Sequence, residues 1–466
     1  MKVIFKKFPF LLESLFVSLV LLIVFQLFGE QQLYVFTNDS GAYLLNSIEL
    51  KVPGDRTVFY SLWIWFLREI MGIESLFPVV FLPFWMVIYG LSLVAKHLMM
   101  RAQIRENRIA VLTLLAVGIW ISGAMWIVTQ IMPDIFTSLL FLSWYLFTVS
   151  IKSNERQLAF FWGIIMVISC VMHNAHLLVI IGLFIMNRLF NKGTINVRYK
   201  RIYNLIYVFP LVLVMGSNLI AGNGFSLSKN APVFLVAKMA ENGILKEYLD
   251  ENCKTETTVL CQFKDSLPEH AWDYIWPSDG IHMKVGGWYH TDSLYRSILQ
   301  GIIADRNLCG ELLVASIKAT FKQLTLIGVG DGIISISDNE TIRKVLTIEY
   351  HYQFHSQGLE KKMNTNFSKL NMLINAVMIS LLILLVVLDV WLKRLGENSS
   401  IFIEFSLMFI VFVVLQAFST GALANILMRL NMRAVWFLMP LMLVLVIGEM
   451  FHVFYIIRIW FLKKYS

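Results

Sequence analysis

The run FPFLLESLFVSLVLLIVFQLF, residues 8–28, decides the fold. It contains about 20 mostly apolar residues, the length that a helix needs to cross a bilayer. A basic start, Met1–Lys7, precedes it, as in a secretory signal peptide. The run is nevertheless too long for a signal peptide, and no small-x-small cleavage motif precedes Gly29. We interpret it as a retained signal anchor.

The same pattern recurs along the chain, which has about ten such runs. Their approximate bounds are 8–29, 76–98, 108–128, 133–151, 157–173, 176–191, 202–222, 370–392, 401–420 and 434–457. Hydrophobic residues make up 58% of the chain and charged residues 15%, with a mean hydropathy of +0.68. One soluble core cannot hide that much apolar surface. The sequence therefore predicts an all-α polytopic membrane protein in a lipid bilayer.

The net charge of +8 comes from short Lys and Arg clusters between alternate apolar runs. Such clusters mark the cytoplasmic side of a membrane protein, so we expect both termini to be cytoplasmic. The chain has no basic stripe with interleaved aromatic residues, and we therefore expect no nucleic-acid partner.

This topology predicts three parts: an N-terminal membrane module of about seven spans over 1–222, an outer subdomain over 223–368 and a C-terminal membrane module of about three spans over 369–466. The first outer loop, 30–75, has helical spacing over 40–50 and 58–71, which predicts amphipathic helices on the outer membrane face.

A segment as long as 223–368 is rarely structureless, so we expect a mainly helical fold there, with helices over 231–250, 291–305 and 310–327. Cys253 and Cys261 are expected to pair in an oxidising compartment, with Cys309 as an alternative partner.

Charged and polar side chains gather at the outer ends of the predicted spans. These residues are Asp39, Asp134, His173, His176, Arg429 and Arg433. A carboxylate held near hydrocarbon is costly and is often functional. Carboxylates can accept a proton from a hydroxyl, and arginines can hold a phosphate through paired hydrogen bonds.

Each of these residues also has a structural interpretation. Asp39 is equally well explained as the cap of a helix that starts near Ser40. Asp134 follows Pro133 and suits the first turn of a helix. The turn with His173 and His176 has only two metal-type ligands. The two arginines could anchor to lipid headgroups, although they stand on the side that the charge rule leaves poor in cations.

Taken together, these residues resemble the GT-C superfamily of integral-membrane glycosyltransferases, which use lipid-phosphate-linked sugars. The resemblance rests on Asn38–Tyr43, which places an acid soon after the first span, and on the aromatic-rich stretch Phe59–Trp63. It also rests on the pair Pro133–Asp134 and on Arg433–Pro440 at the entrance of the last span. Two positions depart from the family pattern: no second acid stands beside Asp39, and Ala434 replaces the usual aromatic residue.

The resemblance implies inverting sugar transfer from a polyprenyl-phosphate donor to an envelope glycan, lipid or protein hydroxyl. The reaction would take place at the outer face of a bacterial inner membrane. Asp39 would be the base, and Arg433 with Arg429 would hold the leaving phosphate. Further substrate contacts would come from Asp134, Tyr43 and Tyr60, and metal contacts from His173 and His176. No cofactor is required by this pattern, and a divalent metal ion is left open.

Other function classes stay open. A polysaccharide polymerase or ligase would share the outer arginines and the lipid donor without needing Asp39. A lipid-linked substrate transporter or flippase would need polar groups through the middle of the membrane, where the predicted spans are mostly apolar. A non-catalytic assembly protein would need neither Asp39 nor Arg433.

Overall fold

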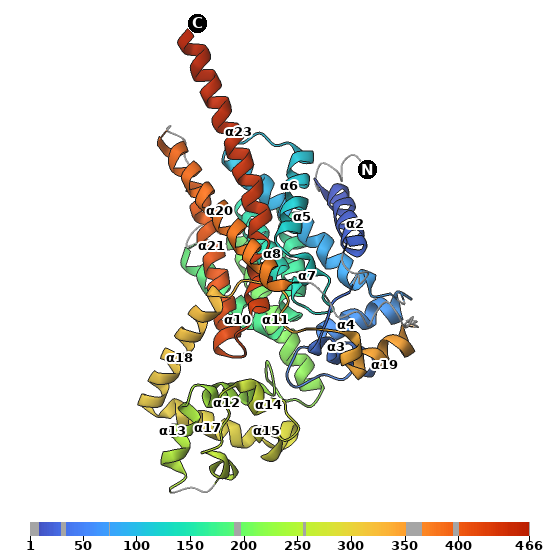
Figure 1. Ribbon diagram of the computed structural model, residues 1–466, viewed down its shortest axis with the longest axis vertical. Coiled ribbons are helices and arrows are strands. Elements are labelled where there is room, and N and C mark those ends of the chain that lie inside the picture. The colour runs from blue at the N-terminus through green and yellow to red at the C-terminus, as the bar shows by residue number, and fades with distance from the viewer. Residues whose placement is uncertain are drawn as a thin grey trace.

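The computed structural model of the chain describes residues 9–28, 34–73, 75–190, 197–254, 258–350, 366–394 and 400–465. Lys2, Lys6 and Lys7 of the basic start lie outside the described residues. The molecule is a long helical bundle with a smaller helical subdomain at one end (Figure 1). The first described helix begins, and the last one ends, at the opposite end of the bundle.

Long apolar helices build the bundle. They are α2 (Leu11–Phe28), α5 (Phe77–Arg101), α6 (Arg108–Ile121), α8 (Ile135–Lys152), α9 (Arg156–Val171), α10 (Asn174–Phe190), α11 (Val197–Ile220), α20 (Phe367–Arg394), α21 (Ser400–Ala417) and α23 (Leu438–Tyr465). Among the described residues, six helices are long and apolar enough to cross a membrane. Four further apolar helices have 10–17 residues. The chain is therefore a helical membrane protein, and the figure of about ten spans stays a prediction.

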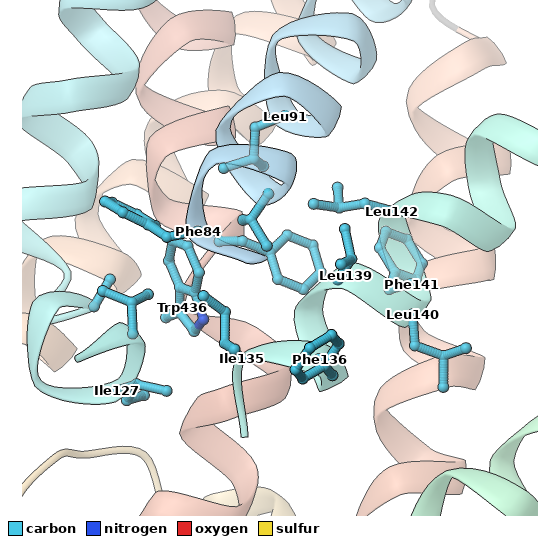
Figure 2. Close-up of a cluster of buried hydrophobic side chains, with 14 of the residues drawn as sticks. Phe84, Leu91, Ile127, Ile135, Phe136, Leu139, Leu140, Phe141, Leu142 and Trp436 are labelled. Carbon is cyan, nitrogen blue, oxygen red and sulfur yellow. The ribbon is translucent and has the colours of Figure 1, made fainter. Parts of the chain in front are cut away.

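Helix α8 is the centre of the bundle, because every residue from Ile135 to Thr148 is buried. Figure 2 shows its first two turns packed against Phe84 of α5 and Trp436. Trp436 and Phe84 are completely buried. Dense packing of this kind holds the first residues of α8 in place and limits their movement. Asp134, directly before α8, is thus attached to a densely packed part of the bundle.

The contact between α6 and α23 depends on a glycine. A Cβ atom on Gly118 would lie 2.4 Å from Cα of Pro440, so only glycine permits this approach. Small residues serve the same purpose in many membrane helix pairs. Helix α20, by contrast, exposes most of its apolar side chains, as expected of a surface in contact with lipid.

Three short helices lie beside the bundle at the subdomain end: α3 (Asn38–Glu49), α4 (Phe59–Trp65) and α19 (Glu340–Glu349) (Figure 1). A π-helical turn, Phe66–Ile70, extends α4. The strands β1 (Phe36–Thr37) and β2 (Ile333–Ile334) pair antiparallel, with Phe36 opposite Ile334. The two predicted amphipathic helices of the first outer loop are therefore present, and β2 holds the start of the first one.

The subdomain has its own apolar core. Its helices are α12 (Ala231–Glu241), α13 (Ile244–Asn252), α14 (Ala271–Ile275), α15 (Ile281–Lys284), α16 (Gly287–His290) and α17 (Asp292–Ala304), and α18 (Arg306–Thr325) returns the chain to the bundle. Cys253 and Cys261 form the expected disulfide, and Cys309 is an exposed thiol. Helix α19 packs outside this core, on α3.

Two predicted helices are interrupted by glycines in the left-handed conformation. Gly243, with φ of 80°, separates α12 from α13 within the predicted helix 231–250. Gly123, with φ of 68°, separates α6 from the short α7 (Met125–Val128) within the predicted run 108–128. Glycine adopts this conformation without the steric cost that other residues meet. The predicted last span, 434–457, begins at the end of α22 (Met428–Val435) and corresponds mainly to α23.

Candidate functional site

A buried ion pair joins the start of α8 to the end of α22. Nη1 of Arg433 lies 2.6 Å from Oδ1 of Asp134, and both side chains have no exposed surface. Ser138, one turn into α8, donates its hydroxyl to the Arg433 carbonyl at 2.7 Å. Residues 299 positions apart are thus held together by their side chains and by the backbone.

The remaining donors of Arg433 are also occupied. When the Gln416 amide is turned so that its oxygen faces the guanidinium group, it accepts from Nη2 at 2.8 Å and from Nε at 3.2 Å. His173 Nε2 lies 3.1 Å from Nη1. A guanidinium group this fully engaged and buried has little capacity left for a substrate. Its geometry favours a role in positioning Asp134.

The charges at this position change two pKa values outside the apolar helices. Burial alone would raise the pKa of Asp134, but the positive charges of Arg433 and Arg429 outweigh it and hold the pKa below its usual value. Burial and the neighbouring Arg433 lower the pKa of His173 well below its usual value. Asp134 is therefore ionised and His173 neutral at pH 7.

The ring of neutral His173 meets a donor at each of its nitrogens. The Ala175 N–H lies 3.1 Å from Nδ1, and Arg433 Nη1 lies 3.1 Å from Nε2. A neutral imidazole has one acceptor nitrogen, so only one of the two contacts is a full hydrogen bond. The charged guanidinium group forms the stronger bond, which favours Nε2 as the acceptor.

Arg429 connects this inner pair to the surface. Its Nε lies 3.5 Å from Asp134 Oδ2, its Nη2 lies 3.9 Å from Asp39 Oδ2, and its side chain is 7% exposed. Its Nη1 has no hydrogen-bond partner among the described residues. Asp331 positions it by accepting the Met428 N–H at 2.7 Å. Arg429 therefore has capacity for an anionic oxygen that Arg433 lacks.

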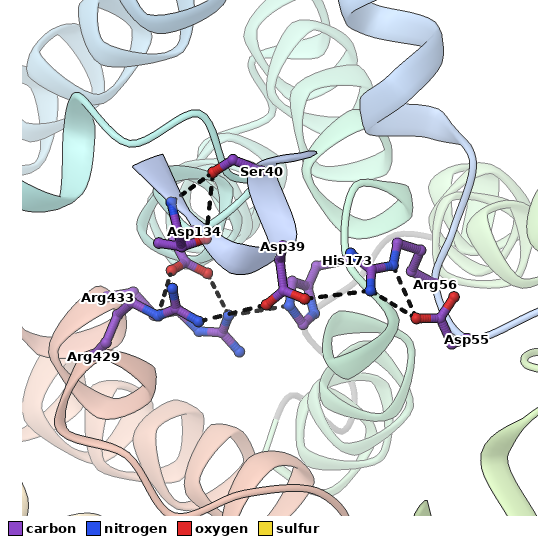
Figure 3. A network of polar contacts seen from close by, with 9 residues as sticks. Asp39, Ser40, Asp55, Arg56, Asp134, His173, Arg429 and Arg433 are labelled. Atoms are coloured by element: carbon purple, nitrogen blue, oxygen red, sulfur yellow. Dashed lines mark hydrogen bonds and ion pairs between the residues drawn. The ribbon is translucent and has the colours of Figure 1, made fainter. Parts of the chain in front are cut away.

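Asp39 is the exposed end of the network. It is the second residue of α3, and the capping role goes to its neighbours, since Ser40 Oγ accepts the Thr37 N–H at 2.9 Å. The Asp39 carboxylate points instead towards Arg429 and towards Arg56, whose Nη2 lies 3.3 Å from Oδ1 (Figure 3). Its side chain is 40% exposed. Asp39 is thus accessible to a substrate.

Arg56 is a member of the network that the sequence did not reveal. It lies in the break between α3 and α4, where its Nη2 and Nε contact Asp55 Oδ2 at 2.7 Å and 3.0 Å. The guanidinium group also stacks 5.0 Å from the ring centre of Tyr43. Asn174 fixes this loop by donating to the Asp55 carbonyl at 2.8 Å.

Tyr43 and Tyr60 form an aromatic wall behind Asp39. Their ring centres are 5.1 Å apart, and Tyr60 also packs on Phe136 of α8. Burial raises the pKa of both phenols, so they are neutral. The exposed fractions of Tyr43 and Tyr60 are 4% and 1%, so both pack beneath the Asp39 carboxylate. The expected contact of these tyrosines with the substrate stays a prediction.

The predicted histidine pair does not fit a metal site. His176 Nε2 contacts Thr137 Oγ1 and its Nδ1 contacts the Ser169 carbonyl, each at 2.8 Å. Both His173 nitrogens are engaged as described above. The parts of the chain that the structure describes hold no group of three or more His, Cys, Asp or Glu side chains arranged for a metal ion.

A second charged feature lies inside the bundle. Glu449 of α23 is completely buried, and neither of its carboxylate oxygens has a hydrogen-bond partner among the described residues. Asp389 of α20 is near enough to interact with it electrostatically. The signal for Glu449 in the sequence is a single acidic residue inside the apolar run 434–457.

Comparison of the chain with protein-family models, with curated proteins and with solved structures found no match.

Proposed function

We propose that this protein is an inverting glycosyltransferase that moves a sugar from a polyprenyl-phosphate donor to a hydroxyl group of an envelope acceptor. The observation that carries the proposal is the position of Asp39. It is a partly exposed carboxylate between two arginines, at one end of an apolar bundle. In this proposal a lipid-linked donor would approach from the membrane and a hydrophilic acceptor from the water.

Asp39 would act as the general base. It accepts the proton of the acceptor hydroxyl while that oxygen forms a bond to the anomeric carbon. The bond between the anomeric carbon and the phosphate oxygen breaks, and its electron pair leaves with the polyprenyl phosphate. Attack from the face opposite the phosphate inverts the configuration at the anomeric carbon.

Arg429 would stabilise the phosphate as its negative charge increases. Its Nη1 has no hydrogen-bond partner among the described residues. Fixed donors at a site of developing charge are usually the strongest contribution to catalysis. Asp134 and Arg433 would position Arg429 without touching the substrate. Because the histidines do not fit a metal site, no step is assigned to a metal ion.

The proposed location is a bacterial inner membrane, with both termini in the cytoplasm and the subdomain in the periplasm. The disulfide between Cys253 and Cys261 supports an oxidising compartment for the subdomain. The basic residues Lys96, Arg101 and Lys152 stand near the ends of α5 and α8 that the charge pattern assigns to the cytoplasm.

The test is release of polyprenyl phosphate by protein in nanodiscs, supplied with polyprenyl-phosphate hexoses and pentoses and an envelope extract as acceptor. We expect Asp39→Asn to reduce turnover about 10²–10⁴-fold. Glu49→Gln is a matched control on the same helix, since Glu49 has similar exposure and pairs only with Lys51 among the described ion pairs. Less than tenfold loss in folded Asp39→Asn would remove Asp39 from the base role and favour a polymerase or ligase.

A transporter is the second candidate, and Glu449 is the observation that favours it. Ionisable groups buried within membrane helices commonly mark proton or substrate paths. Translocation of a fluorescent lipid-linked sugar across proteoliposomes would test this function. Translocation that Glu449→Gln abolishes and Asp39→Asn leaves intact would replace the enzyme proposal with a transporter.

A further inference from the structure

A cluster of aromatic side chains on the subdomain is partly exposed, with Phe234 and Trp288 packed against the core. We call it the aromatic shelf, and it consists of Phe234, Trp272, Trp276 and Trp288. The ring centres of Trp272 and Trp276 are 5.5 Å apart, and those of Trp276 and Trp288 are 5.6 Å apart. Trp272 and Trp276 are 49% and 37% exposed.

The shelf is built on a fixed base. Phe234 belongs to α12, Trp272 to α14 and Trp288 to α16, and the neighbouring Tyr274 and Ile275 are buried in the subdomain core. The Trp288 ring packs edge to face on buried His282, with ring centres 4.6 Å apart. The indoles therefore hold their positions without a ligand, which lowers the entropic cost of binding one.

The charge around the shelf restricts the partner. Residues 264–284 contain four acids, Asp265, Glu269, Asp273 and Asp279, and two lysines, Lys264 and Lys284. Asp265 pairs with Lys246 and Lys264 pairs with Asp250. These four acids are exposed. Asp273 and Asp279 stand within three residues of Trp272 and Trp276, and their charge disfavours phosphate polymers and anionic lipid headgroups, which attract basic segments instead. A partner with apolar faces and no negative charge fits.

The shelf is connected to the candidate site by a short path of contacts. Asn230, the residue before α12, donates its N–H to the Gly54 carbonyl at 2.9 Å, and Ser228 Oγ donates to the same carbonyl at 3.1 Å. Gly54 is two residues before Arg56, which pairs with Asp39. Phe234 lies about one helical turn along α12 from Asn230.

We propose that the aromatic shelf binds a neutral glycan and that this glycan is the acceptor. The C–H face of a pyranose ring is apolar and carries slight positive charge, so it packs on the electron-rich face of an indole. Adjacent indoles would hold consecutive sugars and bring the chain end towards Asp39. The role as acceptor rests on the proposed function, whereas glycan binding itself does not.

The test measures binding of neutral oligosaccharides to the full-length protein in nanodiscs by calorimetry and saturation-transfer NMR. The probes are cellohexaose, maltohexaose, chitohexaose and an α-mannohexaose. We expect at least one to bind, and the double variant Trp272→Ala/Trp276→Ala to weaken it about tenfold or more. Trp391→Ala is the matched control, because Trp391 is 38% exposed but lies on α20.

Three outcomes would overturn the inference. They are no binding of any probe up to about 10 mM, binding that the double variant leaves unchanged, or a defect of that variant only in binding to phosphatidylcholine vesicles. The last result would make the shelf a membrane contact.

Asp39→Asn separates this inference from the proposed function. Glycan binding retained by Asp39→Asn, together with transfer by the wild type, supports both. Glycan binding without any transfer by the wild type would support glycan binding by the aromatic shelf and contradict the proposed glycosyltransferase function. If the wild type transfers sugar and the double variant has the same acceptor KM, the aromatic shelf is not the acceptor site, and the proposed function is unaffected.

Discussion

The two ends of the charged network differ in their access to water. At the inner end, Asp134 and Arg433 are completely buried and 2.6 Å apart. At the outer end, Asp39 and Arg56 are 3.3 Å apart and 40% and 14% exposed. Charges interact strongly in a dry interior and weakly in water. The same pairing of acid and arginine therefore stabilises the fold at one end and leaves a carboxylate available for chemistry at the other.

The largest expected effect on the difference between the two ends is the loss of stability in Arg433→Ala. The substitution leaves the buried Asp134 carboxylate with only Arg429 nearby, and we expect a loss of about 3–5 kcal/mol in the free energy of unfolding. Thermal unfolding in detergent, followed by fluorescence, would measure it. The double variant Asp134→Asn/Arg433→Met should lose less than the single one, and an unfolding temperature equal to wild type for Arg433→Ala would contradict a structural role.

Arg429→Gln tests the residue between the two ends. It removes the guanidinium donor nearest to both carboxylates that still has capacity for a phosphate, so we expect sugar transfer to fall about 10²–10³-fold. Donor turnover in nanodiscs gives the readout. Arg429→Lys keeps the charge but not the paired donors, and should recover part of the activity. Equal activity in Arg429→Gln and wild type would exclude a phosphate role.

Low pH should lower the stability of the fold at the inner end of the network, because His173 is buried in its neutral form. Because the pKa of His173 is lowered in the folded state, the unfolded chain takes up its proton first, near pH 6.5. The stability is complete above that pH and falls as the pH decreases, by up to about 1.4 kcal/mol per pH unit. The lowered pKa of Asp134 acts only below about pH 4.

Unfolding temperatures at pH 7 and pH 5 would measure this slope. His173→Asn should flatten it, and the difference from wild type separates His173 from His282, whose burial lowers its pKa to about 4. An identical slope in the two proteins would show that His173 titrates normally.

The smallest expected effect is that of Asp39→Asn on stability. The lost ion pairs are partly exposed and worth less than about 1 kcal/mol, so the unfolding temperature should hardly change. The same melting experiment serves as the folding control for the activity test. A loss as large as that of Arg433→Ala would make Asp39 a structural residue and erase the distinction between the two ends.

The helices and the position of the inner charges could be predicted from the sequence. Apolar runs of sufficient length become helices, and their order places the outer ends of alternate spans together. Asp39, Asp134, His173, Arg429 and Arg433 stand at such ends, and the structure places them in one network. The local pattern is sufficient here, because the apolar run next to each residue already shows that the residue stands at the end of a span.

Arg56 could not be found in this way. It lies in a turn-forming break, where spacing gives no direction to a side chain, and its partner Asp39 is 17 positions away. The pairing of β1 with β2 is equally hidden, because two strands of two residues each have no periodicity and their pairing joins positions almost 300 residues apart. Both features depend on tertiary packing between segments that each look unremarkable alone.

Arg433 follows Asp134 by 299 positions, and this separation delays their pairing during synthesis. Ribosomes add about 5–20 residues per second, so Asp134 waits about 15–60 s before its partner is synthesised. Throughout that interval the nascent chain carries a carboxylate beside hydrocarbon without its compensating cation. A chain that stalls before α22 keeps this defect permanently, which gives membrane quality control a direct way to distinguish unfinished copies from finished ones.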